Sequence, residues 1–193
     1  MNNIRSLSAL FLLSVLISCK DDDEDVWPQL LANTDIEQGS AAPSGWVTNE
    51  NDGSGLDFVW TDQEASSGSR SLQILKSNDD DTEVWGFWAQ IYEGDIPHGQ
   101  DIELSVMIKG NDIQGQGISI AIRADREDLP GSESQFATTQ GVIPIDGTFD
   151  WRNERLVLND LEPDVNSILI FLLYLPETTG EVFFDDVALT VVE

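Results

Sequence analysis

The 193-residue sequence has a single cysteine, Cys19, and a single histidine, His98. One cysteine leaves no intrachain disulfide to support the fold. His98 lies between Pro97 and Gly99 in an expected turn, and without a second partner it builds neither a zinc site nor a nucleophilic triad. The scarcity of these two residue types excludes scaffolds held by disulfides and enzymes that depend on a histidine triad.

Positive charge is scarce as well. Nine Lys and Arg residues stand against 36 Asp and Glu residues, which gives a formal net charge of −27. Attraction to nucleic acid and to anionic lipid headgroups depends on basic patches. The charge balance therefore excludes nucleic acid as a partner and favours calcium, other cations and neutral ligands.

The sequence begins with a short apolar segment. Arg5 precedes an apolar run from Leu7 to Ile17, which is too short to span a bilayer and is typical of a signal-peptide core. Leu16-Ile17-Ser18-Cys19 then resembles the lipobox of bacterial lipoproteins, and this resemblance implies that Cys19 becomes the first mature residue and carries the lipid. We therefore predict a signal peptide over residues 1–18.

An acidic block, Lys20-Asp21-Asp22-Asp23-Glu24, follows the cysteine. It resembles the export signal by which some Gram-negative bacteria send lipoproteins to the outer face of the outer membrane; the alternative is a solvated, extended spacer. Both interpretations predict a lipidated acidic tether over residues 19–32. The resemblance implies a protein of the outer membrane, exposed at the cell surface and attached to the membrane only through its lipid.

The rest of the sequence has almost no helical periodicity. Short runs in which apolar and polar residues alternate recur between turn-rich stretches, and Ile102, Leu104, Val106 and Ile108 show the alternation most clearly. This pattern predicts an all-β domain over residues 33–193, built as a two-sheet antiparallel β-sandwich of the jelly-roll type. The expected strands are Gly55–Trp60, Ser71–Lys76, Val84–Tyr92, Ile102–Ile108, Gly117–Ala124, Arg155–Leu158, Ser167–Leu175 and Val182–Val192.

Three segments of this domain carry family-like motifs in order along the chain: Asn33–Gly39 with Pro43–Trp46, then Ser67–Ile74, then Gly180–Leu189. Together they resemble the CenC-type carbohydrate-binding modules, which have a galactose-binding-like jelly-roll fold. The resemblance implies a non-catalytic domain that binds a poly- or oligosaccharide. It also implies a structural calcium ion that joins the first strand to the last.

The resemblance places the calcium ligands at Glu37, Asp185 and Asp186. Adjacent side chains of a strand point to opposite faces, so normally only one of the two aspartates shares a site with Glu37. Asp185 has the same parity as the apolar residues Phe183 and Val187, and a carboxylate on that face needs neutralising. This favours Asp185 as the ligand; the alternatives are Asp186, or two surface acids that bind no metal.

The densest aromatic stretch runs from Val84 to Tyr92, and alternation divides it into two rows. The wholly apolar row favours the core, whereas the second row combines two rings with an amide and suits a surface that binds a sugar. In the alternative, Trp88 packs under a loop and Tyr92 lies at an edge. The core row is Trp85, Phe87, Ala89 and Ile91, and the predicted groove consists of Trp88, Gln90 and Tyr92, with Arg123 and Tyr174 completing it.

Catalytic patterns are missing from this sequence. Cleavage of a glycosidic bond usually needs two carboxylates at a defined separation, and no strand carries the Glu-x-Asp-x-Glu pattern of the sandwich-fold glucanases. Gln90-Ile91-Tyr92 resembles the Gln-Ile-His strand of polysaccharide lyases but lacks the histidine. We therefore predict a non-catalytic, surface-anchored lipoprotein that captures a glycan for neighbouring enzymes or importers. The alternative is a structural or protein-interaction subunit of a surface complex.

Overall fold

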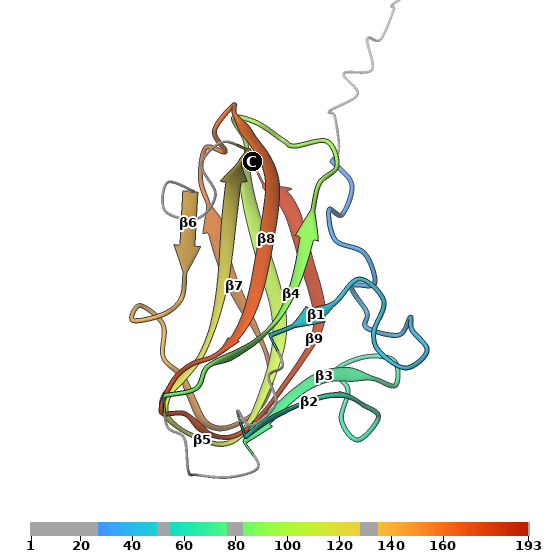
Figure 1. Ribbon diagram of the computed structural model, residues 1–193, viewed down its shortest axis with the longest axis vertical. Helices are drawn as coiled ribbons and strands as arrows, with labels where there is room; N and C mark the ends of the chain where they lie inside the picture. The colour runs from blue at the N-terminus through green and yellow to red at the C-terminus, as the bar shows by residue number, and fades with distance from the viewer. Residues whose placement is uncertain (1–26, 50–54, 77–82, 128–134, 193) are drawn as a thin grey trace, which may run out of the picture.

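The computed structural model describes residues 27–49, 55–76, 83–127 and 135–192, and every regular element in these ranges is a β-strand (Figure 1). The predicted signal peptide and Cys19 lie outside the described residues. Within the described ranges, no helix is long and apolar enough to cross a membrane. The strands are β1 Val47–Thr48, β2 Leu56–Thr61, β3 Ser71–Lys76, β4 Gly86–Tyr92, β5 Asp101–Arg126, β6 Gln135–Thr138, β7 Ile145–Leu158, β8 Val165–Tyr174 and β9 Thr179–Val192.

The long strand β5 belongs to both layers of the molecule. Its first half pairs with β7 and β9, and its second half pairs with β6 and β8. One layer has the order β1-β4-β8-β5-β6 and the other has the order β7-β5-β9-β3-β2. All pairings between strands are antiparallel. The predicted all-β sandwich is confirmed, with the two expected runs 102–108 and 117–124 joined in one strand.

Glycines in the middle of β5 permit its passage from one layer to the other, and Figure 1 shows the strand curving at the lower end of the molecule. The pairing with β7 shifts register between Ile108 and Ile118, where bulges increase bending and twist. Gly115 and Gly117 have φ values of 85° and 80°, a region that costs glycine little. A Cβ on Gly115 would also collide with the backbone of Glu177.

The core lies between the two layers. Ile102, Leu104, Val106 and Ile108 are completely buried, as their alternation predicts. Their counterparts in the facing layer are alternate residues of the second half of β5 and of β8. These are Ile118, Ile120, Ile122, Ile168, Ile170 and Leu172.

The folded part begins earlier than the predicted boundary at residue 33. Leu30 and Leu31 are buried, and the Leu30 N–H donates a hydrogen bond to the Leu189 carbonyl at 3.0 Å. The side-chain oxygen of Gln29 accepts a hydrogen bond from the Leu189 N–H at 2.9 Å. Apolar side chains in this segment gain more from packing than from solvent exposure. Gln29, Leu30 and Leu31, which the prediction assigns to the tether, therefore contact the folded domain.

Candidate functional site

The structure reverses the predicted faces of β4. Trp88 is 5% exposed, and its partner on β8 is the fully buried Leu172. The indole N–H of Trp88 donates a hydrogen bond to the Gln73 carbonyl at 3.2 Å, and its ring meets Phe58 edge-on at 5.9 Å between centroids. The residue therefore belongs to the core, where a protein partner satisfies its one polar group.

Three other residues predicted to contact a sugar, Gln90, Tyr92 and Tyr174, are also held by hydrogen bonds within the protein. Gln90 is buried and exchanges two hydrogen bonds with the backbone of Ala32, at 2.7 and 3.0 Å. Tyr174 is fully buried and its hydroxyl donates to the Gly180 carbonyl at 3.0 Å. Tyr92 is half-buried and donates to the Asp95 carbonyl at 3.0 Å. The prediction of an exposed groove formed by Trp88, Gln90 and Tyr92 and completed by Arg123 and Tyr174 is wrong. Trp88, Gln90 and Tyr174 are buried, and these amphipathic side chains find their hydrogen-bond partners inside the fold.

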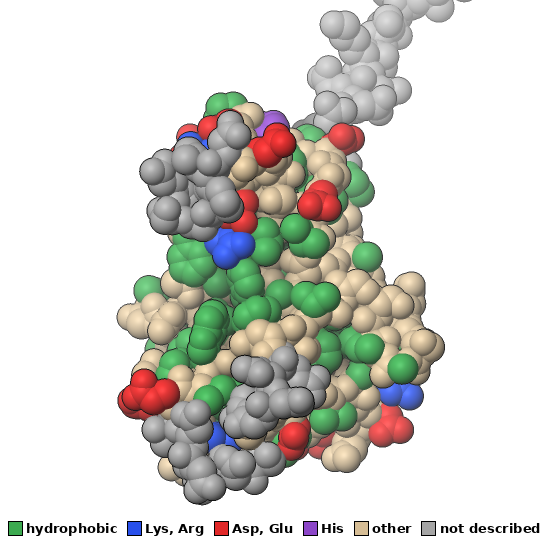
Figure 2. Space-filling view, viewed as in Figure 1, with side chains coloured by type: hydrophobic (Ala, Val, Ile, Leu, Met, Phe, Trp, Pro, Cys, Tyr) green, Lys and Arg blue, Asp and Glu red, His purple; other side chains and the backbone are tan. Residues whose placement is uncertain are grey.

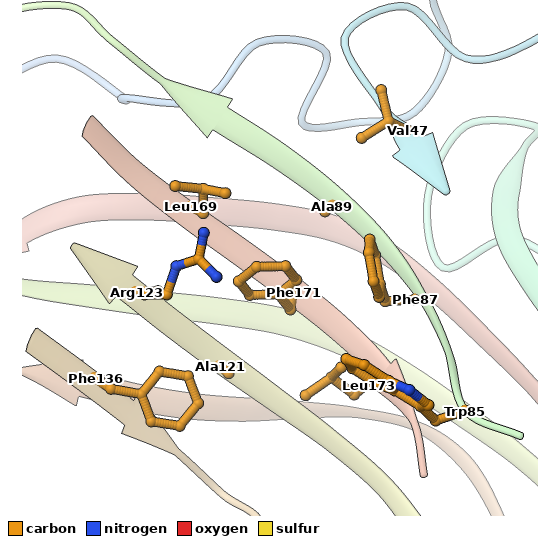
Figure 3. Close-up of a pocket in the computed structure, with 10 residues that line it drawn as sticks. All are labelled: Val47, Trp85, Phe87, Ala89, Ala121, Arg123, Phe136, Leu169, Phe171 and Leu173. Atoms are coloured by element: carbon orange, nitrogen blue, oxygen red, sulfur yellow. The ribbon is translucent and has the colours of Figure 1, made fainter. Parts of the chain in front are cut away.

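The row predicted to be core instead faces outward and contributes to a groove of about 440 Å³ on the β1-β4-β8-β5-β6 layer (Figure 3). Trp85 and Ile91 are each about half exposed. Figure 2 shows hydrophobic side chains gathered on the face that carries β4 and β8. The groove, which we call the outer groove, is lined by Val47, Trp85, Phe87, Ala89, Ala121, Arg123, Phe136, Leu169, Phe171 and Leu173.

Small residues hollow out the floor of the outer groove. Phe171 of β8 lies in register with Ala89 of β4 on one side and with Ala121 of β5 on the other. Paired residues on adjacent strands share a face of the sheet, so the Phe171 ring projects between two methyl side chains. The two alanines are buried, whereas Phe171 is partly exposed, so the ring lines the groove above a floor of small side chains.

Aromatic rings continue from this floor toward both sides. Phe87 meets Phe171 edge-on at 5.3 Å between centroids, and Trp85 lies 5.8 Å from Phe87. Across β5, Phe136 of β6 is 56% exposed. An apolar patch of this kind on a water-facing surface marks a site for a ligand or a partner. A run of rings at these positions offers flat faces to an apolar surface of the ligand.

Arg123 supplies the charge within the outer groove. Its Nε and Nη2 atoms both donate to Oδ2 of Asp125, at 3.1 and 2.8 Å. The centre of the guanidinium group lies 5.4 Å from the centroid of the Phe171 ring. The structure thus places Arg123 in a groove, although a different one from that predicted, and its contact with a saccharide stays a prediction.

The sequence did hold a signal for the outer groove. From Ile168 to Tyr174, the end of β8, every residue is apolar or aromatic, so both faces of this part of the strand are largely apolar. Such a strand needs a cover on each face. The even-numbered residues Ile168, Ile170 and Leu172 cover the core, and the remaining face carries Leu169, Phe171 and Leu173 into the groove.

The predicted calcium ligands lie against the loop that precedes β3. Oε1 of Glu37 accepts hydrogen bonds from the backbone N–H groups of Ser69 and Arg70 at 2.7 and 2.8 Å, and Oε2 accepts from the Ser69 hydroxyl at 2.7 Å. These hydrogen bonds, of which those from Ser69 have the largest effect, lower the pKa of Glu37 because they stabilise the carboxylate form. Glu37 therefore anchors this loop as an ionised side chain.

Asp185 holds the same loop from β9. It is completely buried, and its Oδ2 accepts from the N–H groups of Ser66 and Ser67 at 2.7 and 3.1 Å. Its Oδ1 accepts from the N–H of Asp186 at 2.8 Å. Burial raises the pKa of Asp185 to about 6, against the opposing effect of these amides. A register shift between Ser105 and Met107 places Asp185 opposite Met107. This irregularity interrupts the regular alternation between Asp185 and Val187 on which the predicted orientation of Asp185 depended.

Calcium at this position stays a prediction. All four carboxylate oxygens of Glu37 and Asp185 already accept hydrogen bonds from the protein. In the described part of the chain, no group of three or more His, Cys, Asp or Glu side chains is placed to hold a metal ion. The hydrogen bonds alone account for the attachment of the loop.

Asp185→Ala should lower the free energy of unfolding by at least about 1–3 kcal/mol, because buried N–H groups lose their acceptor. Denaturant unfolding in the presence of EDTA measures this effect. Asp186→Asn is the matched control: Asp186 bonds the Ser67 hydroxyl at 2.6 Å and has a φ of 45°, which asparagine tolerates, so we expect a smaller change. Calcium binding would be supported if added calcium raised the melting temperature of the wild type but not of Asp185→Ala; an unchanged wild-type melting temperature would contradict it.

No family model and no curated protein matches the sequence. Among solved structures, the chain is similar to a Stig cyclase from Fischerella sp. TAU in complex with (3Z)-3-(1-methyl-2-pyrrolidinylidene)-3H-indole, with a TM-score of 0.60 and 16% identity over 85% of this chain and 97% of that one. It is also similar to TmCBM61 in complex with β-1,4-galactotriose, with a TM-score of 0.54 and 18% identity over 86% and 100%.

A third similar structure is the CBM22-1 xylan-binding domain of Paenibacillus barcinonensis Xyn10C, with a TM-score of 0.55 and 15% identity over 87% of this chain and 97% of that one. The fold is therefore a jelly-roll-like β-sandwich of the kind found in carbohydrate-binding modules. A cyclase also has this architecture. Fold alone does not decide function, which depends on the site.

Proposed function

We propose that this protein is a surface-anchored, non-catalytic module that binds a poly- or oligosaccharide in the outer groove. The observation that carries the proposal is a hollow on one sheet face that combines exposed aromatic rings with one guanidinium group. Sugars present apolar C–H faces that stack on flat rings, while their hydroxyl groups need hydrogen-bond donors and acceptors. The similarity in fold to domains that bind galactotriose and xylan supports the same conclusion.

The aromatic residues and the arginine of the groove have distinct roles in this proposal. Phe171 is the central platform for a sugar ring, and Trp85 and Phe87 extend the stacking surface along β4. Arg123 donates hydrogen bonds to hydroxyl oxygens from the edge of that platform. Phe136 borders the opposite side of the groove. Affinity then comes mainly from stacking, at about 0.5–1.5 kcal/mol per aromatic contact beyond burial.

The chemistry of the outer groove supports binding without cleavage. Hydrolysis of a glycosidic bond usually requires two carboxyl groups at a defined separation across the bond. Among the ten residues that line the groove, none carries a carboxylate, and the neighbouring Asp125 is paired with Arg123. A ligand in this groove meets rings, methyl groups and a paired cation, which hold it but do not activate water or a leaving group.

The lipid anchor completes the proposal. The lipobox resemblance at Cys19 supports attachment to the outer membrane, since each buried methylene of an acyl chain adds about 0.8 kcal/mol to membrane binding. The acidic residues that follow extend the tether away from the membrane. A module anchored in this way captures a glycan for neighbouring enzymes or importers.

A second candidate function is docking of another protein in the same outer groove. The observation that favours it is the apolar character of the groove, in which nine of the ten lining residues are apolar and the tenth is Arg123. Apolar and aromatic side chains of this kind also form the centre of protein interfaces. In this alternative the protein is a structural or interaction subunit of a surface complex.

A saccharide screen tests the proposed function. We expect neutral polysaccharides or oligosaccharides to change the tryptophan emission of the purified protein, since Trp85 is half exposed in the groove. Isothermal titration calorimetry then measures the affinity, and the screen must reach millimolar ligand because aromatic stacking is weak. Absence of any response across the screen would contradict saccharide binding and favour the interaction subunit.

A further inference from the structure

We infer that the outer groove selects neutral saccharides and rejects those that carry carboxylates, because Asp125 already neutralises Arg123. This inference rests on the proposed function and names the class of ligand for that site. An arginine in a sugar-binding groove would otherwise suggest a partner for an acidic sugar, since guanidinium groups bind carboxylates strongly. Arg123 is not available for such a carboxylate, because it is already paired with Asp125.

The pair is built into the sheet. Arg123 and Asp125 are two residues apart on β5, so their side chains point to the same face. Two nitrogen atoms of the guanidinium group donate to one carboxylate oxygen, at 3.1 and 2.8 Å. The side chain of Asp125 is 12% exposed and that of Arg123 is 32% exposed. Attraction in this partly desolvated position is stronger than between charges in water.

An acidic sugar would have to compete with Asp125. Binding of its carboxylate to Arg123 would bring a second negative charge beside Asp125, or would leave Asp125 buried without its cation. Both outcomes are costly, because like charges repel at short range and a buried carboxylate that loses its ion-pair partner is strongly destabilised. The overall charge of −27 adds a longer-range repulsion of anions, which salt weakens.

A neutral sugar avoids this cost. The guanidinium group has five N–H donors, and the contacts with Asp125 use one on Nε and one on Nη2. The group lies 5.4 Å from the Phe171 ring, so its other N–H groups stand at the edge of the stacking platform (Figure 3). A hydroxyl oxygen accepts a hydrogen bond there while the ion pair stays intact, and the C–H face of the same sugar covers Phe171.

Matched ligands test the selection. The probes are β-1,4-linked galactotriose, cellotriose, mannotriose and xylotriose; the first three are also tested after oxidation of their C6 hydroxyls to carboxylates, and xylotriose is compared with its glucuronic-acid-substituted form. We expect each neutral sugar that binds to bind at least about tenfold more tightly than its acidic counterpart, as calorimetry at one fixed salt concentration measures. Asp125→Asn frees the charge of Arg123, so we expect this variant to reduce that ratio by improving binding of the acidic sugar.

The possible results separate this inference from the proposed function. Equal or tighter binding of the acidic sugars by the wild type would overturn neutral selection and leave saccharide binding in place. An unchanged ratio in folded Asp125→Asn would show that Asp125 is not the cause and would also overturn it. Binding of none of the probes, neutral or acidic, would count against both. The wild-type ratio decides the question even if Asp125→Asn fails to fold.

Discussion

Trp88→Ala should lower the free energy of unfolding by about 3–5 kcal/mol, which is the expected range for removal of a buried large aromatic ring. Trp88 is 5% exposed, contacts Phe58 edge-on and donates a hydrogen bond to the Gln73 carbonyl. Alanine leaves a cavity between the layers and a carbonyl without its donor. Chemical denaturation followed by circular dichroism measures the loss.

Trp85→Ala is the matched control, because it removes the same side chain three residues away on the opposite face. Trp85 is half exposed, so we expect a change of no more than about 0.5–1 kcal/mol in stability. Saccharide binding should fall in this variant. The opposite pattern, in which Trp88→Ala keeps its stability and loses binding while Trp85→Ala is neutral, would contradict the outward orientation of Trp85.

Phe171→Ala has the largest expected effect on binding, a loss of at least about tenfold in affinity, which corresponds to about 1.4 kcal/mol. The ring forms the centre of the outer groove between Ala89 and Ala121, and both Phe87 and the guanidinium group of Arg123 contact it. Removal of this ring takes away the stacking surface for the sugar and the packing contact that supports Phe87 and Arg123. Calorimetric titration with the tightest neutral saccharide measures the effect.

Ile91→Ala is the control for Phe171→Ala. Ile91 is half exposed on the same layer, next to Leu169 in register, but does not line the groove. Ile91→Ala removes an exposed apolar side chain from the same sheet face but outside the binding site, so the affinity for the saccharide should stay within about twofold of the wild type. Equal losses in Phe171→Ala and Ile91→Ala would contradict a site centred on Phe171.

The fold was predictable from the sequence because alternation of apolar and polar residues marks the buried face of its clearest strand segment, the first half of β5. Ile102, Leu104, Val106 and Ile108 are all fully buried, as the pattern indicates. Alternation says less about β4, where both rows are largely apolar. It separates Trp88 from Trp85 but does not say which row faces the core. The polar atoms of Trp88 and Gln90 suggested that these side chains face the solvent, whereas both side chains hydrogen-bond to backbone carbonyls inside the fold.

Contacts between residues far apart in the sequence determine the burial of some polar side chains, and local sequence patterns do not reveal these contacts. Nothing local to Gln90 indicates that its amide pairs with the backbone of Ala32, 58 residues away. The burial of Asp185 depends on the loop at Ser66 and Ser67, which lies more than 100 residues earlier in the chain. Arg123 was predicted to complete a sugar-binding groove, and the structure puts it in the outer groove, paired with the neighbouring Asp125.

A nuclear magnetic resonance titration with a binding neutral oligosaccharide tests the central claim most directly. If the outer groove is the site, backbone amide signals of β4, β8 and the second half of β5 should shift, with the largest changes around Phe87, Phe171 and Arg123. Signals of the other layer, in β2 and β3, should stay in place. Shifts confined to that layer, or to the loop held by Glu37 and Asp185, would contradict the claim that saccharides bind on the outer face of the β1-β4-β8-β5-β6 layer.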